Sequence, residues 1–547
     1  MYNNDSKVIS GAMLLIGSAL MLSNNAQAAT QAEITAVETP KYWIDKGQAS
    51  LDKADRIANN KKKAKNVILF IGDGMGISTV AASRIFEGQS QPGNRGGEEH
   101  SLSFEKFPHV ALSKTYQVNQ QTSDSAPTMS SMMTGVKTND GELSVGANVK
   151  RGELSGKVID DNKTMTLLEQ AEERGMSTGI ISTARITHAT PAACYAHISN
   201  RDWEADSKLP AGSSVNDIAY QLVNFHKTNL KSDGLEVALG GGRSYFMPDT
   251  MADPEDTTKK GLRKDGDLTA QWTSQYKNAD FVFDRSGWDK IDPAKTDHLL
   301  GLFESSNHME YEADRLKDTG GEPSLTEMTE KAIQILKKNP KGYFLMVEAG
   351  RIDHAHHSGN AYRALTDTVE LSNAVQKAVD MTDSAANDTL IVVSADHSHT
   401  FTIAGYPQRG NPILGLVTSP GKTSPDLAAD GKPYATLSYA NGGGFRETRP
   451  TLTATPMTST TPEKVIPDST RVAADITDTL NITNTLHPNF TQEATVPFAY
   501  GAETHAAEEV AIYAKGPRAY LFQGTQEQSY IYQVMAKALG ITPTVYK

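Results

Sequence analysis

Short apolar runs rich in β-branched residues recur along most of the chain. A run that is apolar throughout and bounded by turn-forming residues is typical of a strand buried on both faces of a sheet. This pattern predicts strands over residues 67–71, 178–182, 236–239, 343–347, 389–394 and 510–514. Between them, apolar positions recur at helical spacing, which predicts helices over residues 78–86, 164–174, 324–338 and 361–379. A further helix is predicted over residues 41–60, ahead of the first strand.

Buried strands that alternate with helices indicate an α/β fold, in which a large central, mainly parallel sheet is flanked by helices on both faces. The alternation fails between about residues 400 and 502, where residues 442–444 form a glycine loop and residues 449–485 are rich in Thr and Pro. We interpret this stretch as a surface insertion in a single domain over residues 29–547, with one or two short strands around residues 434–439. Catalysis need not depend on this insertion.

The first residues have the pattern of a targeting segment. Lys7 precedes an apolar run over residues 8–22, and Ala26-Gln27-Ala28 follows with the small-residue pattern that signal peptidase cleaves. A membrane anchor is the alternative, but the run contains Ser and Gly and is short for a membrane span. We therefore expect residues 1–28 to be a signal peptide, the protein to be periplasmic or secreted, and the mature form to have no stable membrane span.

Composition and charge narrow the range of partners. The 547 residues include 38% hydrophobic and 22% charged side chains, which is typical of a globular protein, and the formal net charge is -12. An acidic protein is not expected to bind nucleic acid. The single cysteine, Cys194, leaves no intramolecular disulfide. If the protein binds an anion, bound cations must reverse the field locally.

Four of the predicted strands run into side chains that can bind metal ions. These side chains are Asp73, Glu348, the pair Asp396 and His397, and the segment from His188 to Thr190. Because ligands bind at the carboxyl ends of the strands in such sheets, we expect these groups to converge. One such carboxylate alone is usually a turn residue or a helix cap. Several unpaired carboxylates in one crevice repel each other, so the sequence predicts cations between them.

A histidine-rich segment supplies further candidate ligands. Asp353 and His357 are one helical turn apart, so a helix starting here would place both on one face, as two ligands of one metal require. A solvated helix start is the alternative for this segment when it is taken alone. Mixed Asp and His ligands suit zinc, whereas Asp, Glu and Thr oxygens suit magnesium.

The candidate nucleophile is Ser125, which follows Asp124. Pro127 near the start and Gly135 at the end indicate a short helix with Asp124 or Ser125 at its N-terminus. Free backbone N–H groups and the helix dipole at that end attract phosphate. An isolated Asp-Ser pair is usually an ordinary helix cap, so the assignment depends on neighbouring metals that can hold the serine as an alkoxide, with no histidine as its general base.

Taken together, these motifs resemble the alkaline phosphatase family, over residues 66 to 538 and in the same order along the chain. The motifs are Asp73 in Ile-Gly-Asp-Gly-Met-Gly, Asp124-Ser125-Ala126, the segment 189–193, Glu348, the segment 353–357, Ala395-Asp396-His397 and Thr504-His505. The segments 351–357, 361–365 and 524–529 are most similar to the animal branch, as are residues 435–444, which correspond to its crown region. The resemblance implies a homodimeric enzyme of broad specificity, which hydrolyses phosphate monoesters through a phosphoserine intermediate.

The resemblance also implies two zinc ions and one magnesium ion per chain. The residues that would hold them are Asp353, His357 and His505 for one zinc ion, Asp73, Asp396, His397 and Ser125 for the second, and Asp73, Thr190 and Glu348 for magnesium. Arg201 matches the arginine that clamps phosphate, for which a planar fork is suited. His188 and His354 occupy positions where the enterobacterial branch has Asp and Lys and the animal branch has His. We expect both to neighbour the phosphate or the ligands.

A calcium site of the animal branch has four counterparts in this chain, namely Glu255, the carbonyl of Phe303, Glu304 and Glu322. The spacing near Glu322 departs from the family pattern, so ordinary surface acids are the alternative.

Competing functions remain at the sequence level. A phosphodiesterase or a sulfatase of the same superfamily is one alternative, although Ser125 lacks the Ser-x-Pro-x-Arg context of sulfatases. Arg201 would also obstruct the second ester arm of a diester. An exported metal- or phosphate-binding protein without turnover is an alternative from another class.

Overall fold

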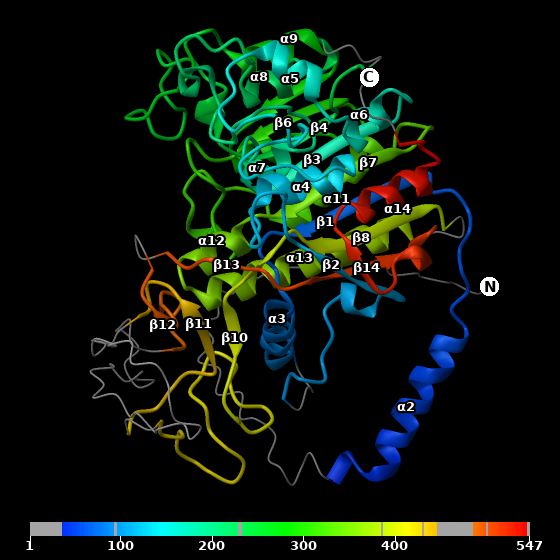
Figure 1. Ribbon diagram of the computed structural model, residues 1–547, viewed down its shortest axis with the longest axis vertical. Helices are drawn as coiled ribbons and strands as arrows, with labels where there is room; N and C mark the ends of the chain where they lie inside the picture. Colours follow the sequence, from blue (N-terminus) through cyan, green and yellow to red (C-terminus); the bar gives the residue numbers. More distant parts are fainter. Residues whose placement is uncertain are drawn as a thin grey trace, which may run out of the picture.

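A broad, twisted sheet forms the centre of the molecule (Figure 1). The computed structural model describes residues 36–91, 96–227, 232–383, 387–428, 431–445, 485–498 and 502–543. The predicted signal peptide and most of the Thr- and Pro-rich stretch lie outside these ranges. Within them, ten strands form the central sheet in the order β15-β2-β14-β8-β1-β7-β3-β4-β6-β5.

The strands of this sheet include all six that the apolar runs predict. In chain order they are β1 (Asn66–Gly72), β2 (His109–Lys114), β3 (Ser177–Arg185), β4 (Val237–Gly241), β5 (Ala279–Val282), β6 (His298–Leu302), β7 (Tyr343–Ala349), β8 (Thr389–Ala395), β14 (Val510–Lys515) and β15 (Thr525–Glu527). Neighbours run parallel except at β14, which is antiparallel to β2 and β8. The predicted mainly parallel sheet is therefore confirmed.

Helices cover both faces of the sheet. The described helices are α2 (Pro40–Asp55), α3 (Ile77–Ser90), α4 (Ser125–Thr134), α5 (Gly156–Asn162), α6 (Leu167–Glu172), α7 (Ala189–Ala192), α8 (Ile218–Val223), α9 (Leu268–Gln275), α10 (Arg285–Trp288), α11 (Leu325–Leu336), α12 (Arg351–His357), α13 (Ala361–Thr382) and α14 (Tyr530–Leu539). Of these, α2 has no buried residue and stands away from the sheet (Figure 1). None of the described helices is long and apolar enough to span a bilayer.

The alternation of side chains along β1 explains the two covering layers. Val67, Leu69 and Ile71 pack in one apolar core with α4, α6 and α14, while Ile68 and Phe70 pack in another with α11 and α13. Successive residues of a strand point to opposite faces, so a strand buried on both sides has to be apolar throughout. The continuous apolar runs of the sequence follow from this packing.

Several predicted helix ends differ from the structure by a few residues, and two of them have a clear local cause. The helix predicted from residue 164 begins at Leu167, because Thr166 accepts the Glu169 N–H (3.1 Å) while Glu169 accepts the Thr166 N–H (2.7 Å), which forms a capping box. The helix predicted to residue 60 ends at Asp55. Asn60 instead accepts the Lys62 N–H (3.1 Å), since asparagine competes with helical hydrogen bonds.

A small three-stranded sheet lies apart from the central one, at the lower left of Figure 1. It consists of β10 (Phe401–Ile403), β11 (Leu437–Asn441) and β12 (Glu493–Val496). Beside it, β9 (Ser398–His399) pairs with β13 (His505–Ala506). Strand β11 overlaps the strand predicted around residues 434–439. The single-domain organisation and the crown-like character of residues 400–502 stay predictions.

Candidate functional site

The four strands that lead into the predicted ligands are neighbours in the sheet, in the order β8-β1-β7-β3. Asp73 follows β1, and Asp396 and His397 follow β8. The segment containing His188 and Thr190 follows β3. Glu348 lies inside β7 and not after it, which corrects the predicted end of that strand. The expected convergence is present, because ligand atoms of these strands lie within 4.8 Å of one another in two overlapping groups.

Ser125 is the first residue of α4 and is only 2% exposed. Its hydroxyl oxygen lies 3.2 Å from Oδ1 of Asp73 and 3.1 Å from Nε2 of His397. The same nitrogen lies 3.3 Å from Asp73 Oδ1 and 3.4 Å from Asp396 Oδ2. Nδ1 of His397 is buried without a hydrogen-bond partner in the described part of the chain. A catalytic triad needs a carboxylate on that nitrogen, so the arrangement fits a cation surrounded by ligands better than a serine–histidine pair.

Asp73 also belongs to a second group, with Glu348 and Thr190. The Thr190 hydroxyl donates to Asp73 Oδ2 over 3.4 Å, and Ser182 donates to Glu348. Burial, together with the nearby charge of Asp396, raises the pKa of Glu348 to about 7. Burial and the surrounding carboxylates also raise the pKa of Asp73. Buried oxygen ligands without a compensating charge fit a divalent cation such as magnesium.

The third group lies around Asp353 on α12. His357 Nε2 and His505 Nε2 lie 3.3 and 3.2 Å from Asp353 Oδ1, and 3.0 Å from each other. The other ring nitrogens are engaged with backbone carbonyls, since Nδ1 of His357 donates to Glu503 O (2.7 Å) and Nδ1 of His505 donates to Ser123 O (2.8 Å). In the neutral form of a ring held in this way, the lone pair lies on Nε2, so both Nε2 atoms are available as metal ligands. Two lone pairs and a carboxylate facing one point fit a bound zinc ion.

His399 joins this third group, and the sequence analysis missed it. Its Nε2 lies 2.8 Å from Asp353 Oδ1, and its Nδ1 lies 2.5 Å from Glu503 Oε2. Burial lowers the pKa of His399, but the two carboxylates outweigh this and raise it to about 9. The contact between His399 and Asp353 holds that carboxylate in place. The signal in the sequence was the spacing His397-Ser398-His399, which in a strand places both rings on one face.

Arg201 lies at the N-terminus of α4. Its Nη1 donates to Asp124 and its Nη2 lies 2.8 Å from Nε2 of His188. Burial raises the pKa of Asp124, but the Arg201 guanidinium more than compensates and the pKa falls well below its usual range. Arg201 and His188, which the sequence placed near the phosphate or the ligands, are therefore brought together next to Asp124, the residue before Ser125.

One nitrogen of His354 is not available as a ligand, because its Nδ1 donates to Gly350 O over 2.8 Å. Its ring lies 3.8 Å, centroid to centroid, from the ring of His308, which also contacts His188 at 5.2 Å. His308 is a second residue that the sequence analysis missed. It is held by Arg185, whose backbone N–H donates to His308 Nδ1 over 3.1 Å.

The residues of the expected calcium site lie in another part of the fold. Glu304 and Glu322 have carboxylate oxygens within 4.8 Å of each other and of Asp318, which the sequence analysis did not include. Burial and the neighbouring acids raise the pKa of Glu322 to about 9 and that of Glu304 to about 7. Glu255 is paired with Arg243 (2.6 Å). Phe303 is fully buried, and its N–H donates to Gly240 O over 2.9 Å.

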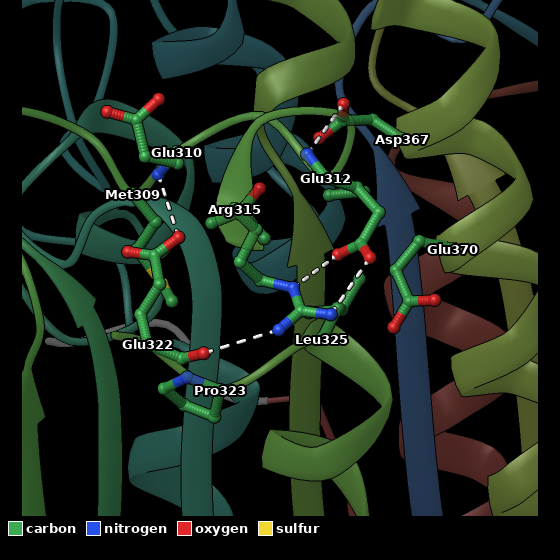
Figure 2. A pocket seen from close by; sticks show the side chains of 11 residues that line it. Met309, Glu310, Glu312, Arg315, Glu322, Pro323, Leu325, Asp367 and Glu370 are labelled. Carbon is green, nitrogen blue, oxygen red and sulfur yellow. Dashed lines mark hydrogen bonds and ion pairs between the residues drawn. The ribbon is translucent and has the colours of Figure 1, made fainter. Parts of the chain in front are cut away.

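A small pocket borders Glu322, as Figure 2 shows. There the Glu310 N–H donates to Glu322 Oε1 over 2.9 Å, and Arg315 donates to both oxygens of Glu312. The other oxygen of Glu322 is buried and has no hydrogen-bond partner among the described residues.

Comparisons with known proteins agree on one family. The family model described as alkaline phosphatase matches residues 64–541. The tissue-nonspecific isozyme of alkaline phosphatase from Homo sapiens is 41% identical over 513 residues, covering 92% of this chain and 89% of its own length. The alkaline phosphatase of Gadus morhua is 40% identical over 512 residues, covering 92% and 97%.

Solved structures show the same fold. The alkaline phosphatase of Thermus thermophilus matches with a TM-score of 0.58 at 23% identity, covering 89% of this chain and 94% of its own. The alkaline phosphatase of the Antarctic bacterium TAB5 matches with a TM-score of 0.55 at 20% identity, covering 88% and 99%.

Proposed function

This chain belongs to the alkaline phosphatase family, and we propose that it hydrolyses a broad range of phosphate monoesters at the site around Ser125, releasing inorganic phosphate through a phosphoserine. The observation that carries the proposal is the pair of Nε2 atoms of His357 and His505, which lie 3.0 Å apart and face Asp353. Backbone carbonyls accept from the Nδ1 atoms, so in the neutral rings the lone pairs of the two Nε2 atoms face each other and the Asp353 carboxylate. A cation bound by these three groups removes the repulsion between them.

The metal content follows from the three ligand groups. We assign one zinc ion to Asp353, His357 and His505, a second to Asp73, Asp396, His397 and Ser125, and magnesium to Asp73, Thr190 and Glu348. Bound cations would neutralise the buried carboxylates and stabilise negative charge on the phosphate and on the departing oxygen.

The chain's own residues bind and orient the ester. The forked guanidinium of Arg201 binds two phosphate oxygens. Asp124 and His188 contact this guanidinium and hold it beside α4. The free N–H groups and the dipole of α4 attract the same anion. The Ser125 oxygen then forms a bond to phosphorus while the bond to the alcohol oxygen breaks and the alcohol leaves. Water attacks the phosphoserine in a second step, which releases phosphate and restores Ser125.

This mechanism predicts broad specificity, because the contacts described are all made to the phosphate and none to the alcohol. A diester would place its second arm against Arg201, so a monoester should be cleaved faster. The test compares the nitrophenyl monoester with the bis-nitrophenyl diester, using wild-type protein, Ser125→Ala and chelator-treated protein. Ser131→Ala is the matched control, because Ser131 is also buried in α4 and its hydroxyl has no partner in the described residues.

We expect Ser125→Ala and chelation each to reduce phosphate release at least about a thousandfold, whereas Ser131→Ala should retain it. Faster cleavage of the diester, or unchanged release from Ser125→Ala, would contradict the proposal.

Three further assignments are proposals of the same kind. Calcium is proposed for the group formed by Glu304, Glu322 and Asp318. The family resemblance adds Glu255 and the carbonyl of Phe303 as further ligands. Family resemblance supports a homodimer, which light scattering of the purified protein tests. The apolar run followed by Ala26-Gln27-Ala28 supports export to the periplasm or the medium, which cell fractionation tests.

A further inference from the structure

We propose that strand β11 positions the ligand group of Asp353, His357 and His505, through the side chains of Tyr439 and Asn441. The proposal rests on the function proposed above for that group. It revises the expectation that catalysis need not depend on the insertion, since β11 lies inside residues 400–502.

Tyr439 holds α12 through His356, the one histidine of the motif for which no role has been assigned. His356 is fully buried and stands between the ligands Asp353 and His357 in the sequence. Its Nδ1 lies 2.8 Å from the Tyr439 hydroxyl, and its Nε2 lies 3.0 Å from the hydroxyl of Thr79 on α3. Both ring nitrogens are therefore fixed by hydroxyl groups of other elements. One of these elements is the insertion.

Asn441 holds the other end of the ligand group. Its Nδ2 donates to the Thr504 hydroxyl over 2.9 Å, and its Oδ1 accepts the Thr504 N–H over 3.0 Å. Thr504 directly precedes His505 in the chain. These two hydrogen bonds fix the backbone at Thr504, immediately before His505.

Strand geometry explains why one element makes both contacts. Tyr439 and Asn441 are two residues apart in β11, so their side chains point to the same face of the strand. The strand itself is fixed by its pairing with β10, in which Tyr439 lies opposite Phe401. The Ala440 N–H also donates to Thr400 O over 3.1 Å.

α12 needs such external support. It is only seven residues long, and its N-cap Gly350 makes no side-chain capping bond. A helix this short is marginal on its own and takes its orientation from its contacts. Because Asp353 and His357 both lie on it, a small rotation of α12 moves both ligands together. Loss of contacts that orient metal ligands typically costs about 10- to 100-fold in metal affinity.

The test measures how fast zinc leaves the fully loaded protein when a chromogenic chelator is added in excess. The variants are Tyr439→Phe, which removes one hydroxyl and keeps the ring, and Asn441→Ala as an independent second variant. Tyr276→Phe is the matched control, because its hydroxyl also bonds a histidine, lying 3.1 Å from Nδ1 of His226, in a different part of the fold.

We expect zinc loss to be about 10- to 100-fold faster in Tyr439→Phe and Asn441→Ala, and unchanged in Tyr276→Phe. The thermal midpoint in saturating zinc should fall no further than in Tyr276→Phe, which also loses a hydroxyl bonded to a histidine, and this separates positioning from a general loss of stability. The visible spectrum of the cobalt-substituted protein should also change in Tyr439→Phe, because it reports the ligand geometry.

Zinc loss at the wild-type rate in either variant would overturn the role of β11. If wild-type protein itself binds no zinc, the proposed function fails, so the two failures are distinguishable.

Discussion

Single side chains determine what this site can bind, and several of them do so through bonds made away from it. His357 and His505 present Nε2 to Asp353 because their Nδ1 atoms are engaged with the carbonyls of Glu503 and Ser123. The pKa of His399 is raised to about 9 because the ring lies between Asp353 and Glu503. These bonding partners are distant in the sequence, so the sequence predicted the ligands but not what orients them.

Arg201→Lys should weaken substrate binding. A lysine ammonium cannot reproduce the planar fork that reaches Asp124 and His188 together and that we propose to bind the phosphate. Loss of a charged hydrogen bond costs about 1.5–3 kcal/mol, so we expect KM to rise about 10- to 100-fold with a smaller change in kcat. Steady-state kinetics with a nitrophenyl phosphate measures this.

Arg151→Lys is the control for Arg201→Lys. Arg151 pairs with Asp140 and is half exposed, so the KM of the Arg151→Lys variant should stay at the wild-type value. An unchanged KM in Arg201→Lys would remove Arg201 from phosphate binding.

The helices and strands carry these residues to one place, and α4 is the clearest case. All ten of its residues are buried, from Ser125 to Thr134, and Gly135 ends it with a positive φ of 77°. The sequence predicted this helix from Pro127 and Gly135. It is held in a fixed position, which places the N–H groups at its start beside Arg201.

Gly135→Ala should destabilise the protein more than Gly152→Ala. Both glycines have positive φ, at 77° and 84°, which costs a residue with a Cβ about 1–2 kcal/mol. At Gly135 an added Cβ would lie 2.6 Å from Cδ1 of Tyr532, whereas at Gly152 nothing lies within 4 Å. Overpacking adds about 1–3 kcal/mol.

Denaturant unfolding of both variants measures the difference. Equal losses of unfolding free energy would show that the contact with Tyr532 contributes nothing.

A buried acid at the end of α6 makes stability depend on pH. Glu172 accepts from Thr178 (2.5 Å) and Ser232 (2.6 Å), and burial raises its pKa from 4.5 to about 7. In this window the folded chain keeps a proton that the unfolded chain has released. The unfolding free energy therefore falls as pH rises from about 4.5 through about 7.

Glu172→Gln should remove this dependence. The quantity to compare is the unfolding free energy of wild type minus that of Glu172→Gln. It should fall by up to about 3 kcal/mol between pH 4.5 and pH 8, because the pKa of Glu172 is raised from 4.5 to about 7 and each pKa unit corresponds to about 1.4 kcal/mol. Denaturant unfolding across this range measures it. A difference that does not change with pH contradicts the buried, protonated acid.

At the scale of the whole molecule, the sequence predicted what depends on local pattern. Five of the six predicted strands, β1, β3, β4, β7 and β8, are buried on both faces and contain apolar runs, so they are recognisable. The sixth, β14, has an apolar run although its side chains alternate between buried and half-buried. Strand β2 was not predicted because His109, Ser113 and Lys114 leave a short apolar run, and β15 because it has only three residues. His308, Asp318 and Glu503 were missed because only the folded chain brings them to their partners.

Metal removal should destabilise the whole molecule. Without cations, Asp73, Asp396 and Glu348 are buried near one another at the carboxyl ends of central strands, and burial raises the pKa of all three. A ligand at a thousandfold its Kd stabilises by about 4 kcal/mol, so a chelator should lower the thermal midpoint and zinc with magnesium should restore it. Calorimetry measures the shift, and an unchanged midpoint would contradict the metal assignment.

The most direct test of the central claim identifies the residue that carries the phosphoryl group. Wild-type protein is mixed with a phosphate monoester, quenched in acid during turnover, digested and analysed by mass spectrometry. The phosphoryl group should be found on the peptide that contains Ser125, at that serine, and be absent from Ser125→Ala. A phosphoryl group on another hydroxyl residue, or turnover without any phosphorylated peptide, would contradict the account.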